Sequence, residues 1–563
     1  MIRDHTWTIT TTDSLQFSGA NMPQSKITYS FVGGTGKTSF PNIEGSAISR
    51  NMFTERNTDG PENKDLRTFM QSIPGIKYLD NLGMGTQCDG LYVPTTGLKA
   101  LNYVPDLFVA FSGQIWKIDR GGNKTVIGDY ALGNCVQFAE SGGERAILLW
   151  VDGQSIHGYD LKKGEAVEIT LPKRIDEDNS YIKPSHIAVV SGSIVLNDTG
   201  SGYVYYSIPY PLSKERRNVF KIINGEVQYK ADKITVDTED VDSGVYCFLD
   251  DYGLQQYFNG ESSSDKTIAV TSVGALLTLF GPSSIEFWQR GDSESYQTWQ
   301  RTSYTINKEQ GLEAPYSVAS INHTQLCIGT GKSNAKCILR IDDTQVQKIS
   351  PLWLDKILNE NDVTSVRAWT YSKNNHSFYI FTIKNETYCF DISTGEWHIR
   401  SSRNFYTGAN KPYMPQFAVW FNNKIITGSC ENGNLYELAD DYFYEDFDSE
   451  HRLPLLRVRQ TPVITSNYKP FVIYELSLEC NTGSMNEYNK EGKALLEMSN
   501  DGGYTYGNVI EASVGLRGQY SVRLKWLNLG MTRQCVLRVS FSEPCNWVIS
   551  DSNIRFQELN TPV

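Results

Sequence analysis

The sequence predicts an all-β protein with a β-propeller body of six or seven blades and an additional β-sandwich-like C-terminal region. Apolar strands joined by Gly, Asn or Asp turns recur from about residue 90 to 440, at nearly constant spacing, and further strands follow a break near residue 440. We therefore expect an N-terminal arm and first strands over 1–90, the propeller over 91–440, and the C-terminal domain over 441–563.

Five hairpins carry the repeat. The first two, 107–119 and 146–160, turn on a glycine, and the third, 193–206, is looser because its turn is longer. The last two, 378–391 and 424–438, are again regular hairpins. Each has an apolar strand followed by a returning strand that carries an aromatic residue, which is the pattern of neighbouring strands in one sheet.

The spacing of these hairpins favours propeller blades. With Trp116, Tyr159, Tyr205, Phe390 and Tyr436 as anchors, adjacent copies stand 43, 46 and 46 residues apart, close to the period of a four-stranded blade. The gap of 185 residues between the third and fourth anchors leaves room for two or three more blades. Stacked β-sandwiches are the alternative.

Within that gap, the hairpins 275–288 and 324–341 are expected to belong to further blades, and the polar, charged stretch 211–265 to be an insertion on one face. Insertions on a rigid scaffold commonly carry contacts with other molecules. A short helix is predicted at 350–358, where Ser350 can cap and Pro351 fits the first turn.

The acidic and aromatic run 440–450 is predicted to be a linker or an exposed edge, with a calcium site as the alternative because oxygen ligands abound without regular spacing. After it, four segments are predicted to be strands of the C-terminal domain: 471–480, 494–499, 520–526 and 535–541.

Composition argues against several functional classes. The net charge of −12 and the pI near 5.3 do not suit broad binding of nucleic acid. The sequence has no apolar N-terminal segment of the secretory type and no run of about 18 apolar residues, so we expect folding in a cytoplasm without a membrane span. Ten dispersed cysteines are expected to be buried free thiols.

No catalytic, cofactor-binding or metal-ligating residues emerge from the pattern. The seven histidines are scattered without metal-ligand spacing, no nucleophile elbow is present, and no cofactor is expected. Gly33-Gly34-Thr35-Gly36-Lys37-Thr38 superficially resembles a phosphate-binding loop, but Phe31 stands where the pattern needs glycine and no helix is predicted to follow. We interpret this stretch as a flexible, Gly-rich arm.

The segment 499–506 resembles the Asp-box hairpin of sialidase-type propellers, with Tyr506 where tryptophan is usual. In that hairpin, Asp and Ser oxygens bind backbone amides of the turn, so we predict a structural role and no chemistry. A sialidase would also need converging arginines, a tyrosine nucleophile and carboxylates.

The hairpin Phe280-Gly281-Pro282-Ser283-Ser284-Ile285-Glu286-Phe287-Trp288 resembles a segment of the packaged-DNA stabilisation proteins, the tail hub or nozzle proteins of short-tailed phages related to P22. Weaker similarities run in the same order along the chain. They are Asn51-Met52, Ile73-Pro74-Gly75-Ile76, Arg367-Ala368-Trp369, the segment 378–391 with Trp397, and the turn at 499–508. The chain departs from the family in extra sequence before Asn51 and around 211–265, so partner contacts made there are not carried over.

The resemblance implies a structural, non-enzymatic virion protein of the tail. It implies a hexameric ring below the head-to-tail adaptor that extends the DNA channel, helps retain packaged DNA, guides its ejection, and carries tail spikes or fibres and a needle plug. The alternatives are a propeller glycosidase of the sialidase type, supported only by the Asp-box, and a carbohydrate-binding tail component, suggested by 32 tyrosines and 11 tryptophans.

Overall fold

The computed structural model divides into two compact units, which are described separately. Unit 1 comprises Met1–Tyr78, Ser372–Tyr413 and Glu437–Val563, and unit 2 comprises Leu79–Tyr371 and Met414–Tyr436. The structure describes residues 25–27, 31–36, 47–56, 68–95, 104–141, 146–167, 169, 171–175, 180–207, 221–223, 226–228, 248, 256–260, 266–291, 299–302, 307–466, 469–485 and 490–559. Strands β5 (Gly75–Asn81), β30 (Ala368–Lys373) and β38 (Asn434–Ala439) each contain a boundary between the units.

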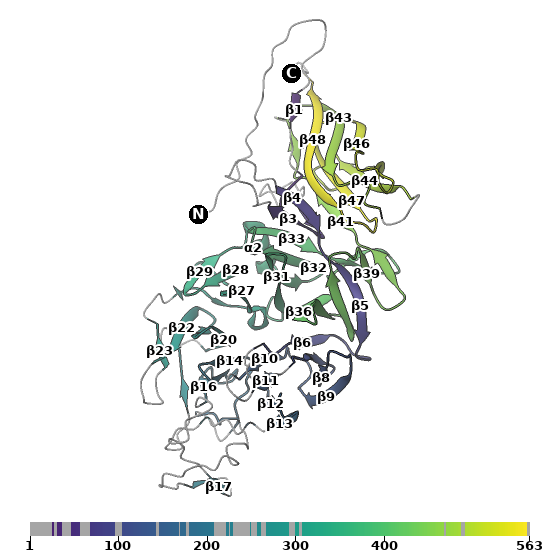
Figure 1. Cartoon of the computed structure of the whole chain (residues 1–563). Helices are drawn as coiled ribbons and strands as arrows, with labels where there is room; N and C mark the ends of the chain where they lie inside the picture. The colour runs from purple at the N-terminus through teal and green to yellow at the C-terminus, as the bar shows by residue number, and fades with distance from the viewer. Residues whose placement is uncertain are drawn as a thin grey trace, which may run out of the picture. The chain divides into compact units, whose positions relative to one another are not determined.

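Unit 2 is built from small antiparallel sheets (Figure 1). The first three are β6 (Cys88–Tyr92), β7 (Leu107–Phe111), β8 (Gln114–Ile118) and β9 (Lys124–Asp129); β10 (Gln137–Glu140), β11 (Ile147–Val151), β12 (Ile156–Asp160) and β13 (Glu165–Val167); and β14 (Ile187–Val190), β15 (Ser193–Asn197), β16 (Val204–Tyr206) and β19 (Tyr257–Phe258). The next two are β20 (Ala269–Val273), β21 (Leu276–Phe280), β22 (Ser284–Arg290), β23 (Trp299–Arg301) and β24 (Asn307–Lys308); and β25 (Gly311–Leu312), β26 (Ala319–Ile321), β27 (Thr324–Thr330), β28 (Lys336–Asp342) and β29 (Gln345–Lys348). Strands β36 (Pro415–Phe421) and β37 (Lys424–Ser429) form a further hairpin.

The second strand of each sheet is apolar on both faces because it packs against two neighbouring sheets. In β7, Leu107, Val109 and Phe111 belong to one buried cluster, whereas Phe108 and Ala110 belong to the next. Strand β11 repeats this division, with alternate residues facing opposite clusters. Side chains alternate along a strand, so a continuous apolar run fills two interfaces. The same arrangement continues through the later sheets, which therefore pack face to face as propeller blades.

One of these clusters joins the beginning of unit 2 to its end. Leu82, Leu91 and Val109 pack with Phe421 and Ile426, more than 300 residues later in the chain. The amide of Leu82 also donates to the carbonyl of Gly433 at 2.9 Å. A propeller needs such a closure because its first and last sheets would otherwise expose an apolar face.

The hairpin of β21 and β22 is held by backbone contacts at its turn. The amide of Leu312 donates to the carbonyl of Gly281 at 2.9 Å, and the amide of Glu309 donates to the carbonyl of Ser283 at 3.0 Å. A side chain cannot fit at Gly311, because a Cβ there would lie 1.9 Å from the carbonyl oxygen of Pro282. The Gly-Pro-Ser turn therefore packs closely against β25, and this contact requires glycine at position 311.

The predicted insertion interrupts a single blade. Strand β16 ends at Tyr206, and its next partner in the sheet, β19, begins at Tyr257. The predicted range 211–265 therefore extends too far, since it includes the strand that completes the sheet. Most of the insertion lies outside the described residues, apart from the short hairpin of β17 (Lys221–Ile223) and β18 (Glu226–Gln228).

Unit 1 contains two larger sheets. One includes β31 (His376–Ile383), β32 (Glu386–Asp391), β33 (Glu396–Arg400), β2 (Ile48–Arg50), β41 (Arg457–Gln460), β47 (Gln534–Phe541), β44 (Gly492–Ser499) and β45 (Ile510–Gly515), with β42 (Ile464–Thr465) beside β47. The other runs β3 (Met52–Arg56), β4 (Thr68–Ser72), β48 (Val548–Glu558), β43 (Phe471–Cys480) and β46 (Leu524–Thr532), with β1 (Ser25–Ile27) beside β48. A small separate pair is formed by β34 (Ser402–Arg403) and β35 (Asn410–Lys411). Strand β39 (Tyr444–Asp446) pairs with β40 (Arg452–Pro454) on one side and in parallel with β5 on the other.

Strand β2 joins the β31–β33 meander to the C-terminal strands of unit 1. Arg50 pairs in parallel with Ile399 on one side and antiparallel with Val458 on the other. Next to it, the side chain of Asn51 donates to the carbonyls of Ser401 and Leu456 at 2.9 and 2.8 Å. A short N-terminal segment thus makes one continuous hydrogen-bonded sheet from strands that are distant in sequence.

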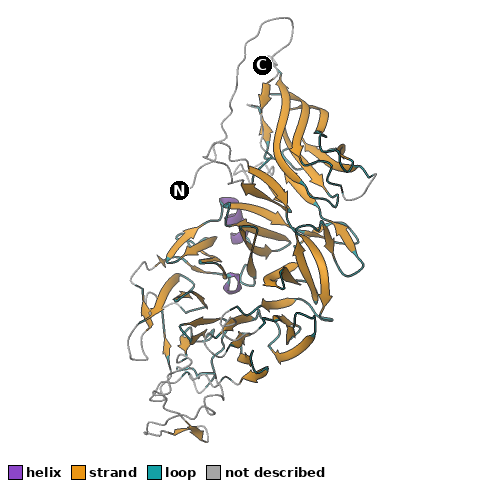
Figure 2. Cartoon of the chain, in the orientation of Figure 1, coloured by secondary structure: helices purple, strands orange, loops and turns teal. Residues whose placement is uncertain are grey.

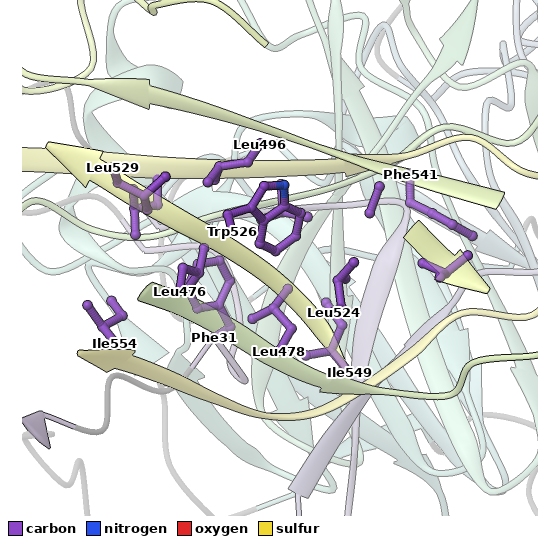
Figure 3. Close-up of a cluster of buried hydrophobic side chains, with 14 of the residues drawn as sticks. Phe31, Leu476, Leu478, Leu496, Leu524, Trp526, Leu529, Phe541, Ile549 and Ile554 are labelled. Carbon is purple, nitrogen blue, oxygen red and sulfur yellow. The ribbon is translucent and has the colours of Figure 1, made fainter. Parts of the chain in front are cut away.

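The C-terminal strands of unit 1 enclose an apolar core (Figure 3). Leu476, Leu496 and Trp526 are each at most 1% exposed, and Phe31 from the N-terminal part of the chain lies among them. Their strands come from both larger sheets, so this core is the filling of a two-sheet sandwich.

Helix is scarce among the described residues, and Figure 2 shows strands throughout. None of the described helices has the length and apolarity needed to span a membrane. The predicted helix is present as α2 (Leu352–Asn359), but the predicted cap is wrong. Pro351 occupies the N-cap position without a side-chain bond, and Ser350 Oγ instead donates to Asp355 Oδ1 at 2.5 Å.

Candidate functional site

A buried polar cluster joins distant parts of unit 2 around Asp89. Arg367 Nη1 donates to Asp89 Oδ1 at 2.7 Å, across 278 positions in the sequence, and the hydroxyl of Tyr130 donates to Asp89 Oδ2 at 2.6 Å. The carbonyl of Asp89 accepts from the amide of Val136 at 2.9 Å and from the thiol of Cys135 at 3.3 Å. Asp89 lies in β6, the first strand of its sheet, and Arg367 directly precedes β30. First strands line the centre of a propeller, where propeller enzymes place their sites.

The thiol, the phenol and the imidazole in and beside this cluster are uncharged at neutral pH. Burial raises the pKa of Cys135 to about 12 and that of Tyr316 to about 12. Burial also lowers the pKa of His186 to about 4, so its neutral ring donates from Nε2 to the carbonyl of Pro315 at 3.0 Å. A thiolate, a phenolate or an imidazolium is therefore not available here, and the geometry describes a structural link between blades.

A serine and a histidine meet in the turn between β11 and β12 but do not form a catalytic triad. Ser155 Oγ lies 2.7 Å from His157 Nε2, and Asp152 Oδ2 lies 3.9 Å from the same nitrogen. A triad needs the carboxylate on the other ring nitrogen, where it fixes the tautomer. Asp152 instead accepts the amides of Gln154 and Ser155 at 2.9 and 2.8 Å, which is the geometry of a turn.

The Gly-rich segment packs tightly in unit 1, so the expectation of a flexible arm is wrong for its described residues. Phe31 is fully buried, and a Cβ at Gly34 would lie 2.8 Å from the carbonyl oxygen of Trp397. The amides of Thr35 and Gly36 donate to the carbonyls of Trp397 and Ala47 at 2.6 and 2.9 Å. These amides already have acceptors and cannot bind a phosphate. Lys37 and Thr38 lie outside the described residues.

The turn that resembles an Asp-box has the predicted structural role. Asp501 Oδ1 accepts the amides of Tyr504 and Thr505 at 3.0 and 2.9 Å, and Ser499 Oγ accepts that of Gly503 at 2.8 Å. Bonds from Ser499 and Thr505 hold the pKa of Asp501 below its ordinary range. The turn connects β44 and β45, which are strands of the sandwich and not of a blade.

Replacing Asp501 with alanine should lower the urea midpoint of unfolding slightly, because exposed turn amides lose their acceptor but can bind water. Urea denaturation of the full chain would measure the change. Asp501→Asn, which keeps an acceptor oxygen, is the matched control and should retain most of the stability. Equal stability of the alanine variant and the unaltered chain would contradict the proposed role of the carboxylate.

The acidic run 440–450 is more ordered than a linker. Tyr444–Asp446 forms strand β39, and Glu445 in its centre is fully buried. The prediction of a linker or exposed edge is therefore wrong for this strand. Among the described residues, no group of three or more His, Cys, Asp or Glu side chains is arranged to hold a metal ion, in this run or elsewhere.

The cysteines that the structure describes are free, as predicted. Seven of these nine are buried and two are partly buried, whereas Cys247 lies outside the described residues. Burial raises the pKa of Cys88 and Cys389 to about 12, so both are protonated thiols that pack as small apolar groups.

These features define a class of protein: an all-β chain that combines propeller blades with a β-sandwich. Two family profiles identify it further. The profile described as "Bacteriophage P22 Gp10, beta-propeller" matches residues 247–442, and the profile described as "Bacteriophage P22 Gp10, beta-sandwich" matches residues 456–557, together about half of the chain. The chain belongs to the P22 Gp10 family of phage stabilisation proteins. Membership confirms the predicted resemblance and fold class, and it indicates a structural virion component.

Other comparisons add little. No curated protein matches the chain significantly. Solved structures that match include the WD40 β-propeller domain of Doa1, with 10% identity and a TM-score of 0.32 over 64% of this chain and 97% of that chain. BBS1N in complex with ARL6DN matches at 8% identity and a TM-score of 0.32, covering 65% of this chain and 97% of that one. A chain of ctPRC2 in complex with H3K27me3 and H3K27M matches at 9% identity and a TM-score of 0.34, covering 65% of this chain and 98% of that chain. Likeness at this level is low, and the fold assignment rests on the sheets and the two family domains.

The Asp89 cluster was not predicted from the sequence. Arg367 belongs to a segment, Arg367-Ala368-Trp369, that resembles the family only weakly, and Asp89 belongs to none of the motifs recognised in the sequence. A buried acidic residue inside an apolar strand, as in Cys88-Asp89-Gly90-Leu91, is the signal that could have drawn attention to it, because such a carboxylate needs a partner.

Proposed function

We propose that this chain is a tail nozzle, or hub, protomer of a short-tailed phage. In this role it extends the channel below the head-to-tail adaptor, helps retain packaged DNA and guides its ejection. The observation that carries the proposal is the presence, in order, of both domains of the P22 Gp10 family in one chain. Its proposed location is the tail of the virion, after assembly in the host cytoplasm.

The hydrogen bonding within unit 1 supports the role of a rigid structural subunit. Strand β2 connects β33 to β41 through backbone hydrogen bonds, and Asn51 bonds to segments on both sides. A subunit of a conduit under internal pressure must keep its shape, and a continuous sheet distributes strain over many backbone bonds.

The negative net charge of the chain supports a transient contact with DNA. A strongly basic lumen would form many phosphate contacts and slow the passage of DNA, whereas this chain carries a net charge of −12. The proposed lumen is therefore non-adhesive. A continuous basic lining in a map of the assembled ring would overturn this point.

The proposed partners are further copies of the chain in a hexameric ring, the head-to-tail adaptor, tail spikes or fibres, and a needle or plug protein. Imaging of the purified chain by negative stain, with mass determination and with or without a candidate adaptor ring, tests the proposal. We expect a ring with a central channel, alone or on the adaptor. A persistent monomer that ignores the adaptor would contradict the nozzle role.

A glycan-processing role loses its support, because the turn that resembles an Asp-box lies in the sandwich and not in a blade. We expect no turnover of sialosides and no binding on a glycan array by the assembled chain. Hydrolysis or specific glycan binding would instead favour the glycosidase or the carbohydrate-binding alternative.

A further inference from the structure

Strand β3 is attached to the β31–β33 meander of unit 1 by a histidine between two carboxylates. His376 Nδ1 lies 2.6 Å from Asp391 Oδ2, and His376 Nε2 lies 2.8 Å from Glu55 Oε2. Asp391 is on β32 in the same meander, whereas Glu55 is on β3 in the other large sheet. An ionised carboxylate only accepts hydrogen bonds, so both ring nitrogens must donate and the imidazole must be charged.

The surroundings favour this charged state. His376 is 4% exposed, and the side chain of Glu55 is 27% exposed, so solvent reaches the pair from the β3 side. Burial by itself would lower the pKa of His376, but the bonds to Asp391 and Glu55 raise it above its ordinary value. Gln71 Nε2 on β4 donates to Glu55 Oε2 at 2.8 Å and holds that carboxylate in place.

The remaining charged groups nearby do not compete for the proton. Arg400 Nε donates to His398 Nε2 at 3.2 Å, so His398 acts as an acceptor there, and burial with the neighbouring charges of Arg400 and His376 keeps its pKa well below normal. The carboxylate of Glu396 accepts from Thr54 Oγ1 at 2.5 Å. Of the two histidines on this cluster, only His376 sits between two anions.

We propose that His376 is a proton-operated clasp that holds strand β3 on the β31–β33 meander and loosens as the imidazolium loses its proton. A neutral ring can donate from only one nitrogen, so its other nitrogen would present a lone pair to a carboxylate. Because the pKa is raised in the folded protein, the stabilisation is complete below the unfolded value near 6.5 and is lost as the pH rises through the folded value. Loosening would release the end of β3 that carries Glu55 from the meander, whereas Met52 at the other end of the strand belongs to the sandwich core.

Hydrogen–deuterium exchange of the full chain tests the clasp. Peptides that cover Met52–Arg56 should open several-fold more at pH 9 than at pH 6, after correction for the chemical exchange rate, because the neutral ring can donate to only one of the two carboxylates. His376→Gln should open equally at both pH values. His157→Gln, at a half-exposed histidine in unit 2, is the matched control and should behave like the unaltered chain.

Glu55→Gln gives a second and milder variant. It removes one of the two anions, so the pH at which β3 opens should move downward while the transition persists. Protection of β3 that is equal at pH 6 and pH 9 in the unaltered chain would overturn the proposal. A pH dependence that survives in His376→Gln, or a midpoint unchanged in Glu55→Gln, would also overturn it, because a purely structural role predicts no shift.

Discussion

Replacing Arg367 with methionine is expected to destabilise unit 2 by about 3 kcal/mol. Asp89 is 4% exposed and receives a hydrogen bond from this guanidinium at 2.7 Å. Methionine fills much of the space of the arginine stem but leaves a buried carboxylate without its counter-ion, which commonly costs about 3 to 5 kcal/mol. Urea denaturation followed by tryptophan fluorescence would measure the loss, and exchange of peptides from β6 would assign it to this unit.

An exposed ion pair supplies the matched control. Lys493 and Glu511 lie 2.6 Å apart, but their side chains are 53% and 55% exposed, so Lys493→Met should leave the stability almost unchanged. Combining Arg367→Met with Asp89→Asn should recover part of the stability, because the unpaired charge is then absent. If the single Arg367→Met variant were as stable as the unaltered chain, the ion pair between Arg367 and Asp89 would not contribute to the stability of unit 2.

The local pattern of the sequence predicts the blades well, for a physical reason. A strand that packs between two sheets must be apolar at every position, and its returning turn must allow left-handed backbone. The run Leu107–Phe111 followed by Ser112 and Gly113, with φ of 53° and 80°, has both properties within seven residues. Such hairpins could be recognised without knowledge of the rest of the chain.

Contacts between distant segments could not be predicted in this way. Asp89 and Arg367 are 278 positions apart, and nothing in the residues around either one specifies the other. The same holds for Glu55, His376 and Asp391, whose arrangement depends on the register of strands from two sheets. Local composition also misled at Phe31, because a nearby run of glycines is typical of flexible segments, whereas the strands that bury this ring lie near the C-terminus.

Replacing Phe31 with alanine is expected to destabilise the sandwich of unit 1 by about 3 to 4 kcal/mol. The ring is fully buried in the sandwich core, and loss of a buried phenyl group commonly costs that much. The backbone bonds of Phe31 would remain, because its amide donates to Ser552 Oγ at 2.9 Å and its carbonyl accepts from Arg459 Nε at 2.6 Å. Urea denaturation of the full chain would measure the change.

Two control variants test whether Phe31 contributes to the core of the sandwich or belongs to a loosely attached segment. Phe31→Leu keeps most of the apolar volume and should cost about 1 kcal/mol, and Val126→Ala, at a strand position that is 44% exposed, should be nearly neutral. If the segment were a free arm, Phe31→Ala would be as neutral as the exposed control. A large loss would instead mean that the N-terminal segment completes the sandwich, since the core formed by the C-terminal strands would then be unfilled without it.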